Sequence, residues 1–484
     1  MFVWLGSFHG LQHCERPPPT PAMLPTNGTL QESLLGATST RSRRASCALI
    51  LHVVVASVSG LLSGYNLCAI SSILAPVEHS LQLCGTSSNG SCAAKQLAVS
   101  ACAIGAMLGG VLGGVVADIF GRRTGLILVC VCCVLGAAAM SAASPGALAT
   151  LFFIGRFLVG ASAGGTGAIA NTYIAEISPP ALRGTLIGVN ELALCTGCLL
   201  SYVAALTFGD DRWRWTCGMP GVAALAQLIV VIVMLEESPM WLAQRRHASP
   251  GDAVVGLDAA RRVALKLGLG ISFLDAEEAA GPHRATAQKD GGTTSSDHCR
   301  PLLLASGLAI AHALTAANTV LYYARDILQS AGVTEPMLAN LAVGSIKFLG
   351  AALIMLIVDR CGRRPLLTGG AFVMGAGYVA IALSASPLVS LGGLLLMIFA
   401  WAATWAGIQW TVVAELLPQH ARGLGIGVAT AEYWLFSFLL SQTLETAFDA
   451  VGERAAFLAF GTATAGAACF VWLAVPETQG RHLR

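Results

Sequence analysis

A short charged pattern closes an apolar segment twice in this chain, about 240 residues apart. The first copy reads ADIFGRR at residues 117–123, and the second reads VDRCGRR at residues 358–364. Two further pairs keep nearly the same separation: Glu176 and Arg183 return as Glu415 and Arg422, and Glu237 returns as Glu477. Because three pairs share one spacing, the sequence predicts a duplicated half, and a duplicated membrane bundle is typical of transporters.

The composition places most of the chain in lipid. Of the 484 residues, 55% are hydrophobic and 11% are charged, whereas soluble domains carry about 25% charged residues. Twelve apolar runs are each long enough for a bilayer core of about 30 Å. They cover residues 47–71, 96–117, 124–143, 149–174, 182–206, 216–235, 301–323, 337–358, 365–385, 388–413, 421–446 and 454–475. We therefore predict an all-α membrane protein with twelve transmembrane helices.

Basic residues gather at alternate ends of these runs, which the positive-inside rule assigns to the cytoplasm. We expect a disordered cytoplasmic tail at 1–46, a six-helix bundle at 47–235, a cytoplasmic linker with short helices at 236–300, a second six-helix bundle at 301–476 and a short cytoplasmic tail at 477–484. The start of the chain lacks a basic stretch and is too short to span, so we expect neither a signal peptide nor a membrane helix there. Since the basic residues stand singly, no nucleic-acid-binding face is expected.

The fifteen cysteines do not form a metal-ligand pattern, and no metal site is expected. Cys195 and Cys198 lie in an apolar run and are predicted to act as small hydrophobic residues. Cys84 and Cys92 flank a polar loop expected outside, where either a disulfide or two free thiols fit the sequence. Asn89 begins a glycosylation sequon in the same loop.

The charged pattern has a physical interpretation of its own. Three glycines, Gly105, Gly109 and Gly113, recur every fourth residue before it and predict a neighbouring helix packed closely on that face. A carboxylate and two arginines at the helix end then suit a clamp that holds neighbouring helix ends in one state and releases them in another. The alternative is that the arginines only anchor the topology.

Taken together, the motifs GRFLVG (155–160), YIAEISPPALRG (173–184), EESPMWL (236–242), NTVLYYARDILQSAGV (318–333), AELLPQHARG (414–423) and PETQG (476–480) resemble the sugar porter branch of the major facilitator superfamily. The resemblance implies two six-helix pseudo-repeats, a substrate site between them and rocking alternating access. It assigns a cytoplasmic gate to Asp118, Arg122, Arg123, Glu176, Arg183, Glu237, Asp359, Arg363, Glu415, Arg422 and Glu477. Met240 departs from the family pattern, which usually has arginine there.

Glu191 and Lys347 resemble the subgroup of facilitative glucose transporters numbered ten and twelve. Each is an ionisable residue in mid-span, where an unpaired charge costs at least about 2.5–3.5 kcal/mol. Each is therefore predicted to face a partner or a wet cavity. Our hypothesis is that the two approach each other across the central cavity; the alternative is that each pairs within its own half.

The resemblance also assigns substrate contacts to Asn318, Tyr322 and Trp410, and His312 and Trp434 are two further candidate substrate contacts. Amides exchange hydrogen bonds with sugar hydroxyls, and aromatic faces cover the C–H side of the ring. The alternative for Trp and Tyr is an interfacial anchor. His312 and Ala313 replace the glutamines usual in the family, and the proline-rich break of the tenth helix is predicted to be lost. An atypical polyol or a non-hexose therefore stays open.

Energy coupling depends on Asn66, which stands where proton-coupled sugar porters have an aspartate paired with the arginine that is Arg156 here. An amide does not exchange a proton near neutral pH, so passive uniport is favoured. Glu191 and His312 are titratable and keep a proton-coupled sugar or polyol symporter open.

The sequence therefore predicts a facilitative monosaccharide transporter, with a hexose-type substrate, in the plasma membrane with both termini cytoplasmic. No catalytic residue, enzyme activity or cofactor is expected. A proton-driven exporter of organic cations and a non-transporting sugar sensor are the rival functions. The sugar, the direction of transport and the oligomeric state are left open.

Overall fold

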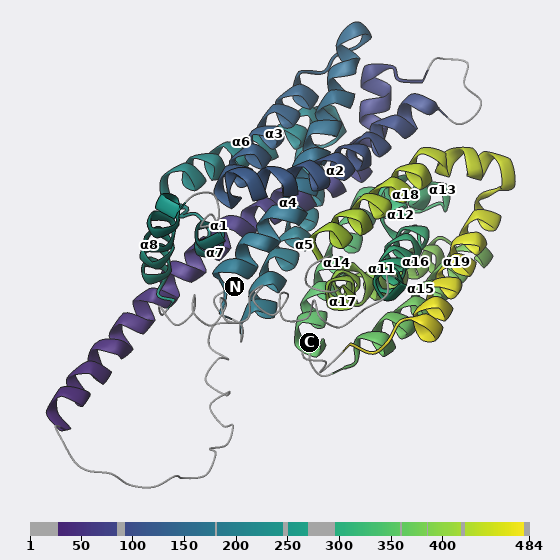
Figure 1. Cartoon of the computed structure of the whole chain (residues 1–484). Coiled ribbons are helices and arrows are strands. Elements are labelled where there is room, and N and C mark those ends of the chain that lie inside the picture. The colour runs from purple at the N-terminus through teal and green to yellow at the C-terminus, as the bar shows by residue number, and fades with distance from the viewer. Residues whose placement is uncertain are drawn as a thin grey trace. The chain divides into compact units, whose positions relative to one another are not determined.

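The computed structural model describes residues 28–84, 92–179, 182–244, 250–269, 296–358, 361–384, 386–417 and 422–478, which are almost entirely helical (Figure 1). The chain divides into two units, residues 1–44 and 45–484. The second unit contains both copies of the charged pattern.

The first half of the chain contains six long helices: α1 (Gly28–Leu81), α2 (Ala93–Phe120), α3 (Arg122–Ala142), α4 (Thr150–Ile177), α5 (Arg183–Phe208) and α6 (Trp213–Met234). Two 3₁₀ turns, η2 (Gly146–Ala149) and η3 (Asp210–Arg212), precede α4 and α6. Two shorter helices follow, α7 (Pro239–Gln244) and α8 (Pro250–Leu267), within the segment expected to be a linker with short helices.

The second half contains α11 (Ser296–Leu314), α12 (Ala317–Tyr322), α13 (Ala324–Ser330), α14 (Pro336–Ile357), α15 (Arg363–Leu383), α16 (Pro387–Ala403), α17 (Trp405–Leu416), α18 (Arg422–Val451) and α19 (Glu453–Ala474). Eleven helical stretches among the described residues are long and apolar enough to cross a bilayer. α18, with 30 residues, is the twelfth long helix at a predicted span. The expected all-α architecture with twelve transmembrane helices is thus confirmed.

Two of the twelve spans are interrupted in the second half. α11 and α12 are separated at Ala316, a non-glycine residue with a left-handed φ of 57°. α16 and α17 are separated at Thr404, whose side chain donates to the carbonyl of Ala400 at 2.6 Å. The prediction that the break of the tenth helix is lost was therefore wrong. Thr404 leaves the helical backbone conformation, with φ −138° and ψ −73°, and the helix is interrupted there without any proline.

The beginning of α1 is a second difference. The helix starts at Gly28, inside the segment expected to be a disordered tail to residue 46. Residues 28–46 include three Leu, three Arg and two Ala, which favour helix, beside seven Ser or Thr residues. The rest of that predicted tail, residues 1–27, lies outside the described residues.

The glycine face of α2 packs on α4, as the spacing of the glycines predicted. A Cβ atom added to Gly105 would lie 2.0 Å from the carbonyl oxygen of Phe157, and one added to Gly109 would lie 2.1 Å from that of Ala161. The contact is reciprocal, because a Cβ on Gly164 would lie 1.9 Å from the carbonyl oxygen of Ala106. The backbones of α2 and α4 therefore touch directly, which fixes the position of the charged end of α2.

Candidate functional site

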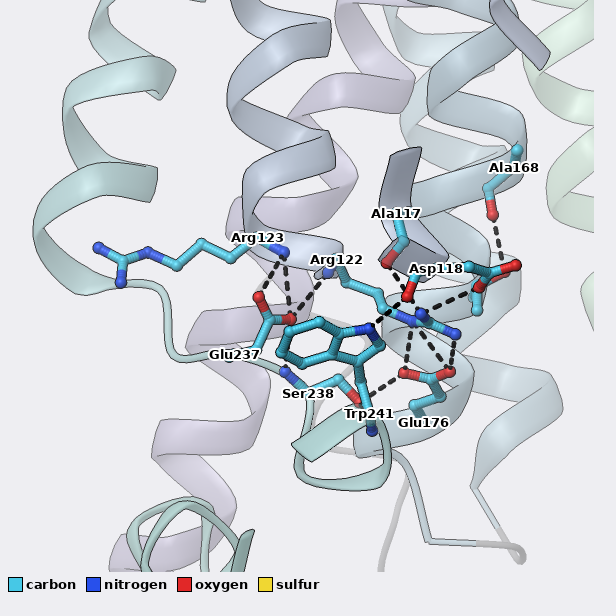
Figure 2. A network of polar contacts seen from close by, with 10 residues as sticks. Ala117, Asp118, Arg122, Arg123, Ala168, Glu176, Glu237, Ser238 and Trp241 are labelled. Carbon is cyan, nitrogen blue, oxygen red and sulfur yellow. Dashed lines mark hydrogen bonds and ion pairs between the residues drawn. The ribbon is translucent and has the colours of Figure 1, made fainter. Parts of the chain in front are cut away.

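The charged end of α2 forms a network with α3, α4 and the segment after α6 (Figure 2). The side chain of Arg122 is 7% exposed, and its guanidinium lies 2.8 Å from the carboxylate of Glu176. The same guanidinium donates to the backbone carbonyl of Ala117 at 2.9 Å and contacts Asp118 at 3.0 Å. Arg122 therefore joins the end of α2 to the end of α4 through a nearly dry ion pair.

Glu237 holds the other side of this network. Its carboxylate accepts hydrogen bonds from the backbone N–H groups of Arg122, at 2.8 Å, and Arg123, at 3.2 Å. These N–H groups begin α3, where a negative charge is favoured. Gly121 makes the approach possible: its φ is 102°, and a Cβ atom there would lie 2.3 Å from a Glu237 carboxylate oxygen. The turn between α2 and α3 thus requires glycine.

Further contacts close the network around Glu176 and Asp118. Ser238 donates through its hydroxyl to Glu176, and the indole of Trp241 donates to the backbone carbonyl of Asp118 at 2.9 Å. Arg123 extends away from them and donates to the carbonyls of Ile232, at 2.5 Å, and Val231, at 3.4 Å, at the end of α6. Figure 2 shows the side chains of Arg122, Glu176 and Trp241 converging from α3, α4 and α7, while that of Arg123 points away from them.

The second copy repeats these contacts at the corresponding positions. Glu477 accepts from the backbone N–H groups of Arg363, at 3.0 Å, and Arg364, at 3.1 Å. A Cβ atom on Gly362 would lie 2.5 Å from a Glu477 oxygen, and Arg363 lies 4.0 Å from Glu415. The internal repeat found in the sequence is therefore also a repeat of hydrogen bonds.

The other predicted gate residues are placed less fully. Arg183 donates to the carbonyl of Ala175 at 3.0 Å, near the end of α4. Asp359 and the side chain of Arg422 lie outside the described residues. Each gate contact given above joins two elements of the same half. We call the helix ends that carry Arg122, Glu176, Arg363 and Glu477 the clamp end.

At the opposite end of α2, polar contacts join the two halves. The ammonium of Lys95 lies 2.9 Å from Asp326 on α13 and 2.9 Å from Glu445 on α18, and 3.5 Å from Glu78 on α1. One turn further into α2, the hydroxyl of Ser100 donates to the side chain of Gln442 at 2.6 Å. α2 of the first half is thereby tied to two helices of the second half.

A second set of contacts joins the halves at the same end. Arg325 on α13 forms a bidentate pair with Asp210, at 2.8 and 3.0 Å, and donates to the carbonyl of Ser72 at 2.6 Å. Asn340 on α14 donates to the hydroxyl of Ser71 at 3.1 Å. The sequence did not predict this inter-half network. At this end the sequence shows only charged residues at the ends of apolar runs, and it does not indicate which of these residues pair.

Most of the predicted substrate contacts gather around one tyrosine of α18, Tyr433. Its ring lies against that of His312, with centroids 4.8 Å apart and the ring planes tilted by 39°, and meets Trp410 edge-on at 5.4 Å. Its hydroxyl accepts a hydrogen bond from Asn318. Trp434 lies beside it, with ring centroids 5.2 Å apart. The structure therefore brings together helices α11, α12, α17 and α18 around a residue that the sequence analysis did not select.

Tyr322, the fifth predicted contact, is buried, and its hydroxyl has no hydrogen-bond partner among the described residues. Gln409, which the sequence analysis also missed, contacts His312 at 3.2 Å. Gln409 and Tyr433 each precede a tryptophan that was predicted to contact the substrate. Helical spacing alone did not indicate that the neighbouring residue belongs to the same cluster.

Glu191 and Lys347 lie on α5 and α14, which pack together across the two halves: a Cβ atom on Gly344 of α14 would lie 2.6 Å from Tyr202 of α5. Glu191 lies within electrostatic range of Lys347, although no direct ion pair joins them among the described residues. The ammonium of Lys347 lies 3.7 Å from the Cys68 sulfur and 5.2 Å from the centre of the Trp401 ring.

Cys68 forms a disulfide with Cys198, which links α1 to α5. The prediction that Cys198 is a small hydrophobic residue was therefore wrong, because the close packing of α1 on α5 brings two thiols together that are 130 residues apart in the chain. Cys195 is free and buried, as expected. The structure also pairs Cys84 with Cys92, whereas Asn89 lies outside the described residues.

Asn66 and Arg156 are neighbours, but their side chains do not bond to each other. Arg156 is 1% exposed and donates to the backbone carbonyls of Asn66, at 2.9 Å, and Ala98, at 3.0 Å. The Asn66 amide donates instead to the carbonyl of Leu62 at 3.0 Å. The buried guanidinium is thus satisfied by carbonyl oxygens, which do not titrate.

Known proteins share both the sequence pattern and the fold. The glucose transporter GlcP of Staphylococcus epidermidis is 28% identical over 445 residues, which cover 90% of this chain and 95% of that protein. A D-xylose transporter of Levilactobacillus brevis is 29% identical over 442 residues, covering 88% and 92%. The xylose transporter XylE from E. coli, in a partially occluded inward open conformation, superposes with a TM-score of 0.75 at 24% identity, covering 90% of this chain and all of that one (100%).

A family model described as "Sugar (and other) transporter" matches residues 52–484. A match of that length covers both six-helix halves, both copies of the charged pattern and the inter-half contacts. The chain therefore belongs to the sugar (and other) transporter family, with the fold of the major facilitator superfamily, and is a multi-pass membrane transporter and not an enzyme.

Proposed function

We propose that this protein transports a monosaccharide across a membrane by alternating access, without coupling to a proton. The family and the glucose and xylose transporters among its relatives support a sugar as substrate. The observation that carries the proposal is the cluster around Tyr433, where Asn318 offers an amide and Trp410 and Trp434 offer aromatic faces. Amides and aromatic rings together suit a hydroxylated ring with an apolar C–H face.

The two ends of the helices support alternating access. At the Lys95 end, ion pairs and hydrogen bonds cross between the halves, whereas the clamp contacts described above stay within each half. Opening the Lys95 end requires these cross-half contacts to break. We propose that the clamp residues of one half then meet the other half, so that one end closes as the other opens. By the positive-inside rule, we place the clamp end and both termini in the cytoplasm, in a plasma-membrane protein.

The surroundings of Arg156 support uniport. Its donors reach carbonyl oxygens, and the neighbouring Asn66 carries an amide where a proton carrier needs a titratable group. A second candidate, proton-coupled symport, has one observation in its favour. Glu191 is a titratable group on a membrane-spanning helix, it has no direct ion pair among the described residues, and it lies within electrostatic range of Lys347.

Uptake by the purified protein in proteoliposomes separates these candidates. The panel contains labelled hexoses, pentoses, inositol and dehydroascorbate, with and without a pH gradient across the vesicle membrane. We expect saturable uptake of at least one monosaccharide that the gradient does not change. Accumulation driven by an acidic exterior would establish symport instead, and a protein that takes up none of the panel would contradict the proposed function.

A matched pair of tryptophan variants tests the site. Trp410→Leu removes the ring that meets Tyr433 edge-on, and we expect it to weaken sugar affinity about tenfold. Trp215→Leu is the control, because Trp215 is 64% exposed near the start of α6. If the two substitutions changed sugar affinity equally, the cluster around Tyr433 would not be the sugar site.

A further inference from the structure

Gln409 of α17 is fully buried, and only one end of its amide has a partner. Its side-chain oxygen lies 3.2 Å from Nδ1 of His312. Its side-chain nitrogen, Nε2, is buried and has no hydrogen-bond partner among the described residues. Buried amide nitrogens in proteins almost always donate to an acceptor, so this nitrogen requires an explanation.

The direction of the hydrogen bonds around His312 fixes which end of the amide is free. The indole N–H of Trp401 only donates, and it lies 2.8 Å from Nε2 of His312. Nε2 must therefore be an acceptor, so the proton of the neutral imidazole sits on Nδ1. Nδ1 then donates to the oxygen of Gln409, and the amide NH₂ of Gln409 points away from His312.

The imidazole itself has little freedom to turn. Its ring contacts those of Tyr433, with centroids 4.8 Å apart, and Trp405, at 5.7 Å. Both of its nitrogens are bonded, one to Trp401 and one to Gln409. Trp401, His312 and Gln409 thus form a chain of hydrogen bonds that runs from α16 through α11 to α17 and ends in an unused donor.

We propose that the Nε2 amide group of Gln409 donates a hydrogen bond to a hydroxyl oxygen of the transported sugar, and that His312 and Trp401 are positioning residues that aim it. The inference rests on the proposed function, because it names the part of the protein that recognises one hydroxyl. Gln409 precedes Trp410 in the sequence of α17. The ring of Trp410 contacts Tyr433, and Asn318 donates a hydrogen bond to the same tyrosine. A sugar bound there offers hydroxyl oxygens as acceptors, which a purely apolar ligand lacks.

The test compares the transported sugar with its deoxy and deoxyfluoro analogues as inhibitors of uptake. In the unsubstituted protein, one deoxy analogue should bind about three- to tenfold more weakly than the parent sugar, as expected for one hydrogen bond. The fluoro analogue at that position keeps an acceptor and should recover part of the affinity. In Gln409→Met, the parent sugar and that deoxy analogue should inhibit equally, which identifies the lost contact by a double-mutant cycle.

Two further variants separate recognition from folding. Gln227→Met is the matched control, because Gln227 is a buried glutamine of α6 whose amide donates at 3.0 Å to Val55 and at 2.7 Å to Ser59 inside the protein. It should leave the analogue pattern unchanged. Gln409→Glu keeps the shape of the side chain and replaces the donor by an acceptor. It should therefore weaken binding of the parent sugar more than that of the deoxy analogue, even if Gln409→Met does not reach the membrane.

Trp401→Phe tests the positioning residues. It removes the N–H group that orients His312, and it should lower the discrimination against the deoxy analogue while transport of the parent sugar at saturating concentration continues. Full discrimination in both Gln409 variants would overturn the inference, and so would an equal loss of affinity for every analogue. Absence of any sugar uptake by the unsubstituted protein would instead overturn the proposed function.

Discussion

Lys95 and Asp326 belong to different halves of the protein, and 2.9 Å separates the Lys95 ammonium from the Asp326 carboxylate. The side chain of Lys95 is 18% exposed and also contacts Glu445 and Glu78. One cation therefore holds three carboxylates that would otherwise repel one another. The charge of Lys95 therefore stabilises the closed arrangement of that end.

We expect Lys95→Met to favour the state in which the Lys95 end is open, by about 1 kcal/mol or roughly fivefold in population. The substitution leaves Glu78, Asp326 and Glu445 without their shared partner. The measurement is the labelling rate of a cysteine at Ser100, a buried position of α2, by a membrane-impermeant thiol reagent. Labelling should be faster in the Lys95→Met background than with lysine present.

Lys266→Met is the control for this prediction. Lys266 also forms an ion pair, with Glu236 at 2.7 Å, but its side chain is 64% exposed and both residues follow α6 in the same half. Its removal should not change the labelling of Ser100→Cys. A labelling rate unaffected by either lysine would show that the Lys95 contacts do not limit opening.

Glu237 and Glu477 perform the same task in the two halves, and each accepts from two successive backbone N–H groups. Glutamine at either position replaces one carboxylate oxygen by an NH₂ group that faces an N–H donor, and it removes the negative charge that is favoured at the start of the helix. We expect Glu237→Gln and Glu477→Gln each to lower the maximal uptake rate about tenfold, with a smaller change in KM. Glu335→Gln, at an exposed residue before α14, should leave both parameters unchanged.

The two glycines facing these carboxylates predict an asymmetry between the copies. Alanine at Gly121 or Gly362 would place a Cβ atom 2.3 or 2.5 Å from a carboxylate oxygen. Only Gly121 has a left-handed φ, 102°, whereas Gly362 has an ordinary φ of −57°. Gly121→Ala should therefore reduce transport and thermal stability more than Gly362→Ala does, because it adds backbone strain of about 1 kcal/mol to the same clash. Equal losses of transport and thermal stability in the two variants would show that the clash with the carboxylate, and not backbone strain, determines both effects.

The contact of α2 with α4 gives a prediction about stability alone. Gly164→Ala would force a Cβ atom to 1.9 Å from the backbone of α2, so the helices must separate; we expect a loss of about 1–3 kcal/mol. Gly114→Ala is the matched control, since no heavy atom lies within 4 Å of its Cβ position. Thermal unfolding followed by fluorescence-detected size exclusion measures both. An unfolding temperature that Gly164→Ala leaves unchanged would contradict the close backbone contact.

The sequence predicted features that repeat or follow a period, and it missed those that depend on tertiary register. The close packing of a helix on the glycine face of α2 followed from the spacing of the glycines, and the repeated charged helix ends followed from the internal repeat. The ion pair between Arg325 and Asp210 did not, because 115 residues separate them and no periodicity indicates which helix ends meet. The break at Thr404 was missed for a different reason: this part of the chain contains no proline, the residue that most clearly marks a helix break in a sequence.

The last prediction concerns Glu191 and Lys347, which lie within electrostatic range of each other but form no direct ion pair among the described residues. Lys347 is 3% exposed and is surrounded by the Cys68 sulfur and the Trp401 ring, neither of which neutralises its charge. Glu191 on the facing helix is the carboxylate within electrostatic range. If the two compensate each other, Glu191→Lys and Lys347→Glu should each abolish transport, because each substitution puts two like charges on facing helices in a low-dielectric region. The exchanged double variant should recover at least a tenth of the original uptake rate. Double variants as inactive as the single ones, while present in the membrane at normal amounts, would show that each residue serves its own half.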